Sequence, residues 1–371
     1  MSFLHSYRHT WQLLFADKGA ILLLLLAGIM YSFYYPLPYS NETVSNVPYA
    51  IVDFDQSPSS RQYIRALTAS PNLSLTAILH DADELERYLF AGDIMGAVFI
   101  PPHFHESLLT QQQTTIQVAG HGGYLLASGT LLGAASEATL TLSIGLSGHI
   151  LEAHGVPASM ANDLRNPVQL ETIPLYNPQE GYGSYVVPAV MIMIIQQTLL
   201  MGITLMLGTL TEQQRMPAGR EAYLGMLAAF SSIGFINCLY FFGFVTWYHD
   251  YPSQGELLNM IVFAALFSMT VAAMALWLAR FFQNREQGMQ LLLATAIPMF
   301  FLAGYAWPVE AMPTALQYLR WLLPSTAGIQ GFIAINQMGA ELTHVGREMA
   351  ILAGLCLTFV ILGLYAYRRQ R

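Results

Sequence analysis

Charged residues are scarce in this chain, and their scarcity excludes an ordinary soluble globule. Only 10% of the 371 residues are charged, whereas soluble domains carry about 25%. So little charge cannot cover a globule of this size with polar surface, and lipid must therefore surround part of it. The net charge of -8 also argues against a nucleic-acid partner.

Residues that carry common chemistry are sparse as well. The two cysteines, Cys238 and Cys356, fall inside apolar runs and imply no disulfide framework. The single lysine, Lys18, stands between Asp17 and Gly19, so the Gly-Lys-Ser/Thr motif of a P-loop is absent. The sequence therefore predicts that this chain is not an enzyme, binds no cofactor of its own, and depends on another polypeptide for any ATP hydrolysis.

The apolar residues are gathered into six runs, at 20–35, 184–210, 222–248, 257–279, 290–307 and 349–367. A membrane-spanning helix needs about 20 such residues. The first run could be a signal peptide, but bulky aromatic residues follow it in place of a small-residue cleavage site. We therefore expect a retained first transmembrane helix at 19–35 and five more within 184–371.

Basic residues predict the orientation of these helices, because cytoplasmic loops are enriched in Lys and Arg. Alternate connections are basic, with Arg8 and Lys18, then Arg215 and Arg220, then Arg280 and Arg285, then Arg368, Arg369 and Arg371. Residues 36–183 hold fourteen Asp and Glu against four Arg. We expect both termini in the cytoplasm and 36–183 on the outer side.

Three segments need a separate interpretation. Residues 124–151 are apolar, but Glu137 at their centre would be costly in lipid, so we expect a helix of the outer domain. Residues 314–336 are divided by Pro324 and interrupted by Arg320, which favours a re-entrant outer segment near 308–345. Residues 1–18 have apolar side chains at helical spacing, typical of a cytoplasmic helix in the membrane surface.

Within 36–183, predicted strands at 47–54, 73–79, 96–100 and 115–119 alternate with predicted helices, which indicates an α/β domain. The fold class is therefore a mainly α membrane protein with six transmembrane helices, an N-terminal interfacial helix, and an α/β extracytoplasmic domain between helices 1 and 2.

Two groups in the outer domain have the residue types of a metal or acid/base site. Asp53 and Asp55 would share a face of a strand, although Asp-x-Asp at a strand end is more often turn and cap chemistry. His103 and His105 follow two prolines, but no third ligand stands at convincing spacing. We predict no metal site.

Several stretches together resemble the ABC-2 type permeases, in the exporter subgroup with a large periplasmic insert between the first two helices. The similarity covers essentially the whole chain. It is carried by 52–57 with 60–61, by 97–101, by 176–178 and 185–188, and by 303–308 with 312–313 and 323–324. The spans also hold no central charged residue of the kind that ion-driven carriers use.

The resemblance implies a dimer of permeases, homo- or heteromeric, with an ABC ATPase subunit that binds ATP and Mg. It also implies export of small hydrophobic or amphipathic molecules from the inner membrane, with a periplasmic adaptor and outer-membrane channel as further partners. The ATPase-coupling loop would contain Glu212, Arg215, Arg220 and Glu221, although it lacks the family's usual Gly-Thr-x-Glu ending.

Polar residues within the spans, Gln196, Gln197, Asn237 and Tyr240, are candidates for the translocation path. Interhelical hydrogen bonding is the alternative interpretation for all four. An outer gate is expected at Pro298, Tyr305, Trp307, Pro308 and Pro324, from the resemblance and from the broken-helix pattern.

Other classes of function stay open at this point. A membrane-anchored receptor or assembly factor would act through the outer domain, and a secondary carrier would use an ion gradient. A membrane enzyme has no catalytic constellation in the sequence to support it.

Overall fold

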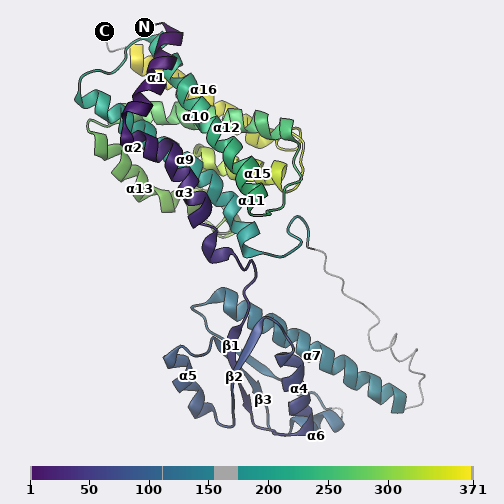
Figure 1. Ribbon diagram of the computed structural model, residues 1–371. Helices are drawn as coiled ribbons and strands as arrows, with labels where there is room; N and C mark the ends of the chain where they lie inside the picture. The colour runs from purple at the N-terminus through teal and green to yellow at the C-terminus, as the bar shows by residue number, and fades with distance from the viewer. Residues whose placement is uncertain (1, 111, 154–173, 369–371) are drawn as a thin grey trace. The chain divides into compact units, whose positions relative to one another are not determined.

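The computed structural model describes residues 2–110, 112–153 and 174–368, and the chain divides into two compact units (Figure 1). One unit is Met1–Glu42 with Pro174–Arg371, and the other is Thr43–Ile173. The predicted outer domain, 36–183, includes residues at both of its ends that belong to the first unit. The difference arises because Tyr39 and Glu42 pack against the start of the helix at Tyr182, within the first unit.

The described residues of the larger unit are helical. The first transmembrane region, here called span one, runs from Lys18 to Tyr39. It consists of α2 (Lys18–Ile21), a π-helical segment (Leu22–Leu26), α3 (Ala27–Tyr34) and a 3-10 turn (Leu37–Tyr39). The helices outside span one are α1 (Phe3–Ala16), α9 (Tyr182–Glu212), α10 (Arg220–Leu239), α11 (Thr246–Tyr248), α12 (Leu257–Leu278), α13 (Arg285–Leu302), α14 (Thr314–Leu319), α15 (Pro324–Asn336) and α16 (Gly346–Arg368).

Within the described part of the chain, six helices are long and apolar enough to cross a membrane. Five of them fall on predicted spans: Lys18–Tyr39, Tyr182–Glu212, Arg220–Tyr248, Leu257–Phe281 and Gly346–Tyr367. The sixth is Leu125–Gly145, the segment expected in the outer domain. The protein is thus a multi-pass membrane protein, but its six candidates differ from the predicted six at one helix.

The predicted fifth span, 290–307, corresponds to α13, which begins earlier, at Arg285. Arg285, Glu286, Gln287 and Gln290 dilute its apolar character, so α13 is not among the six candidates. The helix nevertheless lies alongside α9 (Figure 1) and exposes Leu293 and Ile297. An exposed apolar face on a helix that packs in the membrane unit is what lipid contact requires.

The N-terminal segment forms α1, as predicted, and its buried residues include two polar ones. Ser6, Thr10 and Leu14 are buried, and the Ser6 hydroxyl donates to the Ala222 carbonyl oxygen of α10 at 2.9 Å. Gly225 allows this approach, because a Cβ there would lie 2.6 Å from the Cβ of Ser6. The predicted apolar residues Phe3, Leu4 and Phe15 are exposed, which leaves them available to a membrane surface.

The segment near 308–345 is broken as the sequence indicates. A 3-10 turn (Val309–Ala311) precedes α14, a second 3-10 turn (Arg320–Leu322) follows it, and α15 begins at Pro324. Proline is well suited to the first turn of a helix, because its missing N–H has no intrahelical partner there. Arg320 is buried and its guanidinium lies over the Trp321 ring at 4.5 Å.

The second unit is an α/β domain with a four-stranded sheet. Its elements are β1 (Val47–Asp53), α4 (Pro58–Thr68), β2 (Leu73–Leu79), α5 (Leu85–Ala91), β3 (Gly96–Ile100), α6 (Phe104–Leu109), β4 (Gln117–Gly120) and α7 (Leu125–Ala153). The strand order is β2-β1-β3-β4, with β1 parallel to both neighbours and β4 antiparallel to β3. The predicted alternation of strands and helices is confirmed in this unit.

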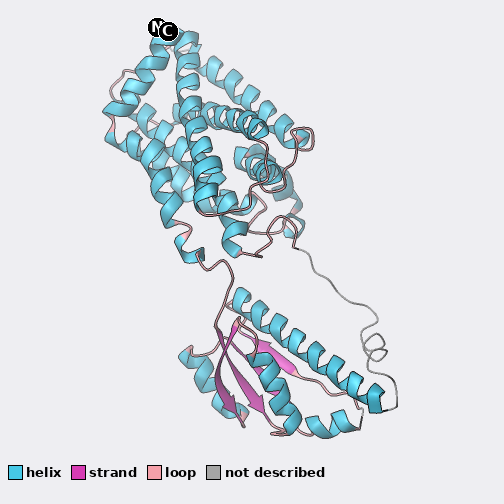
Figure 2. Ribbon diagram, turned by 45° about the vertical axis from the view of Figure 1, so that its right-hand side comes forward, coloured by secondary structure: helices cyan, strands magenta, loops and turns pink. Residues whose placement is uncertain are grey.

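Helices cover both faces of the sheet (Figure 2). On one face Tyr49 and Val98 pack with Tyr63 of α4 and with Leu131 and Leu142 of α7. On the other face the sheet packs against α5. The helix α7 therefore uses its buried stripe to complete a domain core, and this use explains why an apolar segment of span length carries Glu137.

Candidate functional site

An ion pair joins Asp17, which lies between α1 and span one, to Arg285 at the start of α13. Asp17 is the N-cap of α2 and accepts from the backbone N–H groups of Gly19 (2.9 Å) and Ala20 (3.2 Å). The guanidinium of Arg285 donates to both oxygens of the same carboxylate, with Nη2 to Oδ1 at 2.8 Å. Such a bidentate, charge-assisted pair is among the stronger hydrogen-bonded contacts.

The pair perturbs the carboxyl group and extends to α9. The Arg285 hydrogen bond lowers the pKa of Asp17, against the opposing effect of partial burial. Arg285 also donates to the Thr209 hydroxyl at 2.6 Å. Three segments that are far apart in the sequence are thus held by one arginine.

Glu212 strengthens the same junction. Its Oε1 accepts the backbone N–H of Arg285 at 2.7 Å, so it satisfies a free donor at the start of α13. The two helices approach closely here, since a Cβ on Gly208 would lie 2.8 Å from the Arg285 Cα. The end of α9 and the start of α13 are therefore a tightly packed, polar joint, which we call the inner joint (Asp17, Thr209, Glu212, Arg285).

Of the four residues predicted for the coupling loop, Glu212 belongs to the inner joint. Arg215, Arg220 and Glu221 are exposed, on the connection between α9 and α10 and on the first turn of α10. This connection is tied to the end of α16, because Gly219 N–H donates to the Tyr367 carbonyl oxygen at 3.4 Å. An exposed, charged connection between two spans suits contact with a separate protein.

Sequence reasoning assigned no site role to Asp17 or Arg285. The signal available for Asp17 was its place directly before an apolar run, which is typical of an N-cap. Arg285 was visible only as one of two basic residues in a loop. Their pairing joins residues 268 positions apart, a distance over which no local pattern carries information.

The four predicted path residues contact different partners. Gln196 donates to Ser325 Oγ of α15 at 3.2 Å, and Gln197 donates to the Met299 sulfur of α13 at 3.3 Å. Asn237 donates to the Leu24 carbonyl oxygen at 2.8 Å. All three contacts cross between helices, in keeping with the alternative interpretation of interhelical bonds.

Asn237 and Tyr240 in particular bind span one to α10. The Leu24 oxygen that Asn237 contacts lies in the π-helical segment of span one, and a second π-helical segment (Tyr240–Val245) follows α10. The Tyr240 hydroxyl lies 2.9 Å from Ser32 Oγ. Irregular helical turns of this kind are frequent at functional positions.

Gln197 lines a cavity. This groove, of about 360 Å³, lies between α3, α9 and α13. Its wall is formed by Tyr31, Tyr35, Val190, Met193, Ile194, Gln197, Thr198, Met201, Leu293, Ala296, Ile297 and Phe300. The buried Oε1 of Gln197 has no hydrogen-bond partner among the described residues, and most of the other side chains in the wall are apolar. Such a composition suits an amphipathic molecule.

The residues predicted for the outer gate lie in four places. Tyr305 stacks on Tyr185 with 4.6 Å between ring centroids, and each hydroxyl donates to the other residue's carbonyl oxygen. Trp307 and Pro308 are exposed in the following turn, and Pro298 is exposed within α13. Pro324 is buried at the start of α15. Tyr305 thus joins the segment after α13 to α9.

In the α/β unit, Asp53 and Asp55 both accept hydrogen bonds from nearby backbone N–H groups. Asp53 Oδ1 accepts from the N–H groups of Asp55 and Gln56, and its Oδ2 accepts from Ser60 Oγ. Asp55 accepts from the N–H of His105. The turn-and-cap interpretation therefore describes Asp53. Among the described residues, no group of three His, Cys, Asp or Glu side chains could hold a metal ion.

Comparison with known proteins agrees with this arrangement. A family model for the ABC-2 family transporter protein matches residues 18–365. The inner membrane transport permease YhhJ of Escherichia coli (strain K12) is 23% identical, over 96% of this chain and 94% of its own length. The probable multidrug ABC transporter permease YbhR of the same organism is 21% identical, over 82% of this chain and 80% of its own length.

Proposed function

This chain belongs to the ABC-2 family of transporter proteins, and from that premise we propose that it is the membrane-spanning subunit of an ATP-driven exporter. The family assignment makes it a transport permease and implies an ABC ATPase as partner. The further content of the proposal is the direction of transport, outward, and the cargo, a small hydrophobic or amphipathic molecule taken from the inner membrane or the cytoplasm.

One observation carries the proposal. The three helical segments that enclose the groove around Gln197 are span one, α9 and α13, and the same three segments are joined by Asp17, Thr209 and Arg285. A force applied at the inner joint therefore acts on the walls of the groove through continuous helices. Rigid, packed elements of this kind can transmit a displacement between distant sites.

The proposed topology places the inner joint, α1 and the α9–α10 connection on the cytoplasmic side. The unit Thr43–Ile173 lies on the outer side, where a periplasmic adaptor and an outer-membrane channel would continue the route. A second permease, identical or different, completes the transporter and faces the groove. The ATPase binds beside Glu212, Arg215 and Arg220, and closure of its nucleotide sites moves the inner joint.

The experiment starts from the full chain, purified in mild detergent with whatever ATPase accompanies it. After reconstitution into vesicles, we expect ATP-dependent accumulation of a lipophilic dye on the side opposite the ATPase. Alanine at Arg215 and Arg220, both of which are exposed, should reduce ATPase association or transport. Arg87→Ala, at an exposed position of α5 in the α/β unit, is the matched control.

Two results would overturn the proposal. One is nucleotide hydrolysis by the purified chain in the absence of any companion. The other is dye transport that continues after ATP depletion and stops when an ionophore removes the ion gradient, since that behaviour belongs to a secondary carrier.

A further inference from the structure

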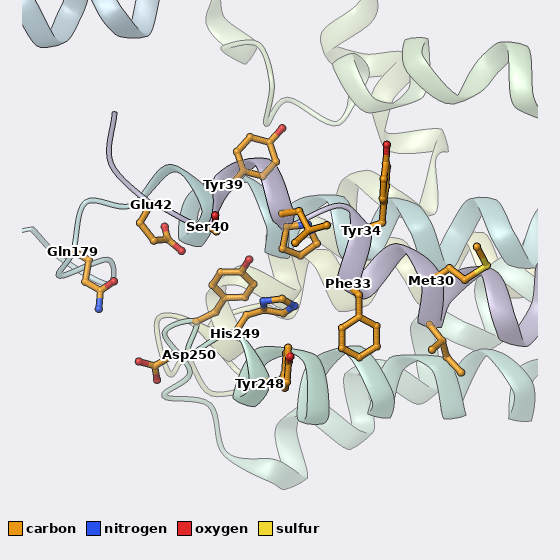
Figure 3. A pocket seen from close by; sticks show the side chains of 14 residues that line it. Met30, Phe33, Tyr34, Tyr39, Ser40, Glu42, Gln179, Tyr248, His249 and Asp250 are labelled. Atoms are coloured by element: carbon orange, nitrogen blue, oxygen red, sulfur yellow. The ribbon is translucent and has the colours of Figure 1, made fainter. Parts of the chain in front are cut away.

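A second and larger cavity, of about 880 Å³, lies where the Glu42 end of span one meets the residues after α11 (Figure 3). Its wall comes from α3, from the turn at 36–42, and from 248–251, with Gln179 added from the segment before α9. The cavity is distinct from the groove around Gln197, with which it shares no lining residue.

Aromatic rings form two sides of this cavity. On one side Phe33 is edge-on to Tyr248 at 5.4 Å, and the rings continue through His249 to Tyr251 at 5.0 and 5.5 Å. On the other side Tyr39 lies between Tyr35 and Tyr182, at 5.6 and 5.5 Å. The electron-rich faces of such rings attract organic cations.

The charged groups of the cavity have one sign. Its fourteen described lining residues include Glu42 and Asp250 and no lysine or arginine. Glu42 is held in place, because its Oε2 accepts the N–H of Ser184 at 2.9 Å. Asp250 is exposed, and it also lines an adjoining cavity of about 620 Å³. Two carboxylates therefore line this space, and no lysine or arginine does so among its described lining residues.

His249 also lines the cavity. Its Nε2 lies 2.8 Å from the Ser32 carbonyl oxygen, and a carbonyl oxygen can only accept, so Nε2 carries a hydrogen. In the neutral ring Nδ1 is then an acceptor. The rest of the wall includes the apolar residues Ile29, Met30, Pro36 and Leu37, together with Tyr34, Ser40 and Gln179.

We propose that this cavity binds amphipathic organic cations, with aromatic rings around the cationic centre and Glu42 and Asp250 supplying the opposite charge. The inference rests on the proposed export function, for which it names a substrate class and a site on the outer half of the membrane unit. Tyrosine enrichment at a membrane interface also occurs without any ligand, so the test must separate a site from an aromatic belt.

The probes are tetraphenylphosphonium and tetraphenylborate, which have nearly the same size and shape and opposite charge. Binding to the full chain is measured by calorimetry in nanodiscs, with empty nanodiscs subtracted. We expect saturable binding of the cation and at least tenfold weaker binding of the anion. This measurement needs neither ATP nor the ATPase, so its failure leaves the export proposal standing, and a failure of export leaves this site standing.

Variants locate the site. Asp250→Asn, at an exposed position, should weaken cation binding about three- to tenfold, and Tyr248→Leu about threefold. The matched controls are Glu310→Gln and Tyr318→Leu, which alter an exposed carboxylate and an exposed tyrosine outside the cavity. Glu42→Gln is a further variant, used only if it folds, because Glu42 also holds the start of α9.

Equal binding of the two probes would contradict the inference, as would cation binding that Asp250→Asn and Tyr248→Leu leave unchanged. A loss of binding in the control variants equal to that in the site variants would also refute it, because it would show an unspecific interfacial effect.

Discussion

The ion pair between Asp17 and Arg285 should contribute both to stability and to coupling, and its energy can be worked out from its exposure. The side chains retain 17% and 32% of their accessible surface, between a surface pair, worth about 0.2–1 kcal/mol, and a buried pair, whose disruption costs about 3–5 kcal/mol. Partial screening by solvent brings the energy of the pair closer to that of a surface pair. We therefore expect Arg285→Gln to cost about 2 kcal/mol of unfolding free energy.

A double-mutant cycle isolates the pair from its other contacts. Asp17→Asn keeps a side-chain oxygen to cap α2 while it removes the charge, and Arg285→Gln removes the bidentate donor. We expect the double variant to be less destabilised than the sum of the single variants, by about 1–2 kcal/mol. Unfolding free energies are compared in the same mixed micelles. Costs that add to within about 0.3 kcal/mol would refute the assigned pairing.

The same variants test whether the pair transmits force. We expect Arg285→Gln to retain the ATPase during purification, because the exposed residues Arg215 and Arg220 are unchanged, while ATP-dependent transport falls. Transport at the normal rate with the ion pair removed would show that the inner joint only stabilises the fold.

Three further predictions follow from the contacts around the groove. Gly208→Ala should destabilise the chain by about 1–3 kcal/mol, because the new Cβ would lie against the backbone of Arg285. Gly354→Ala in α16 has open space around it and should be neutral or stabilising. Thermal unfolding of the two variants compares them. Gln197→Leu should keep or raise the unfolding free energy, since it removes an unpartnered buried oxygen, yet change the transport rate of amphipathic dyes. The stability that the Asp17 carboxylate contributes should be present above about pH 4 and be lost as the pH falls through its lowered pKa. The Asp17→Asn variant lacks this titration. A difference in unfolding free energy between the unaltered chain and Asp17→Asn that stays constant with pH would contradict the assignment.

Much of the architecture could be predicted from the sequence, because lipid and charge leave local signals. Runs of apolar residues mark five of the six candidate spans, and the alternation of strands and helices marks the α/β unit. The segment around Glu137 shows the limit of composition, since α7 is long and apolar enough for a membrane and yet packs against a sheet through Leu131 and Leu142. A single central carboxylate carried more information there than mean hydropathy.

The site was less predictable, because its contacts join distant parts of the chain. Gln196, Gln197 and Asn237 were recognisable as polar residues in apolar helices, but which neighbour each one contacts depends on the rotation of each helix about its axis. That rotation places Gln197 on the groove and Gln196 against Ser325. The inner joint was missed for the same reason, since Asp17 and Arg285 carry individually ordinary signals.

The distribution of bonds around the groove indicates where it can open. α9 and α13 are joined at both ends, by Glu212 with Arg285 at one end and by Tyr185 with Tyr305 at the other. Within the described part of the chain, Asp17 and Arg285 join the start of span one to α13, and Asn237 and Tyr240 join span one to α10 and to the π-helical segment after it. The far end of span one is joined to α9, since Glu42 accepts the N–H groups of Ser184 and Tyr182, so polar contacts bridge both ends of span one. If α9 and α13 move as one body and span one moves with α10, the seam between them passes through the groove. The Asp17–Arg285 pair then lies across that seam at the end nearest Glu212, so opening the groove at this end requires the pair to separate.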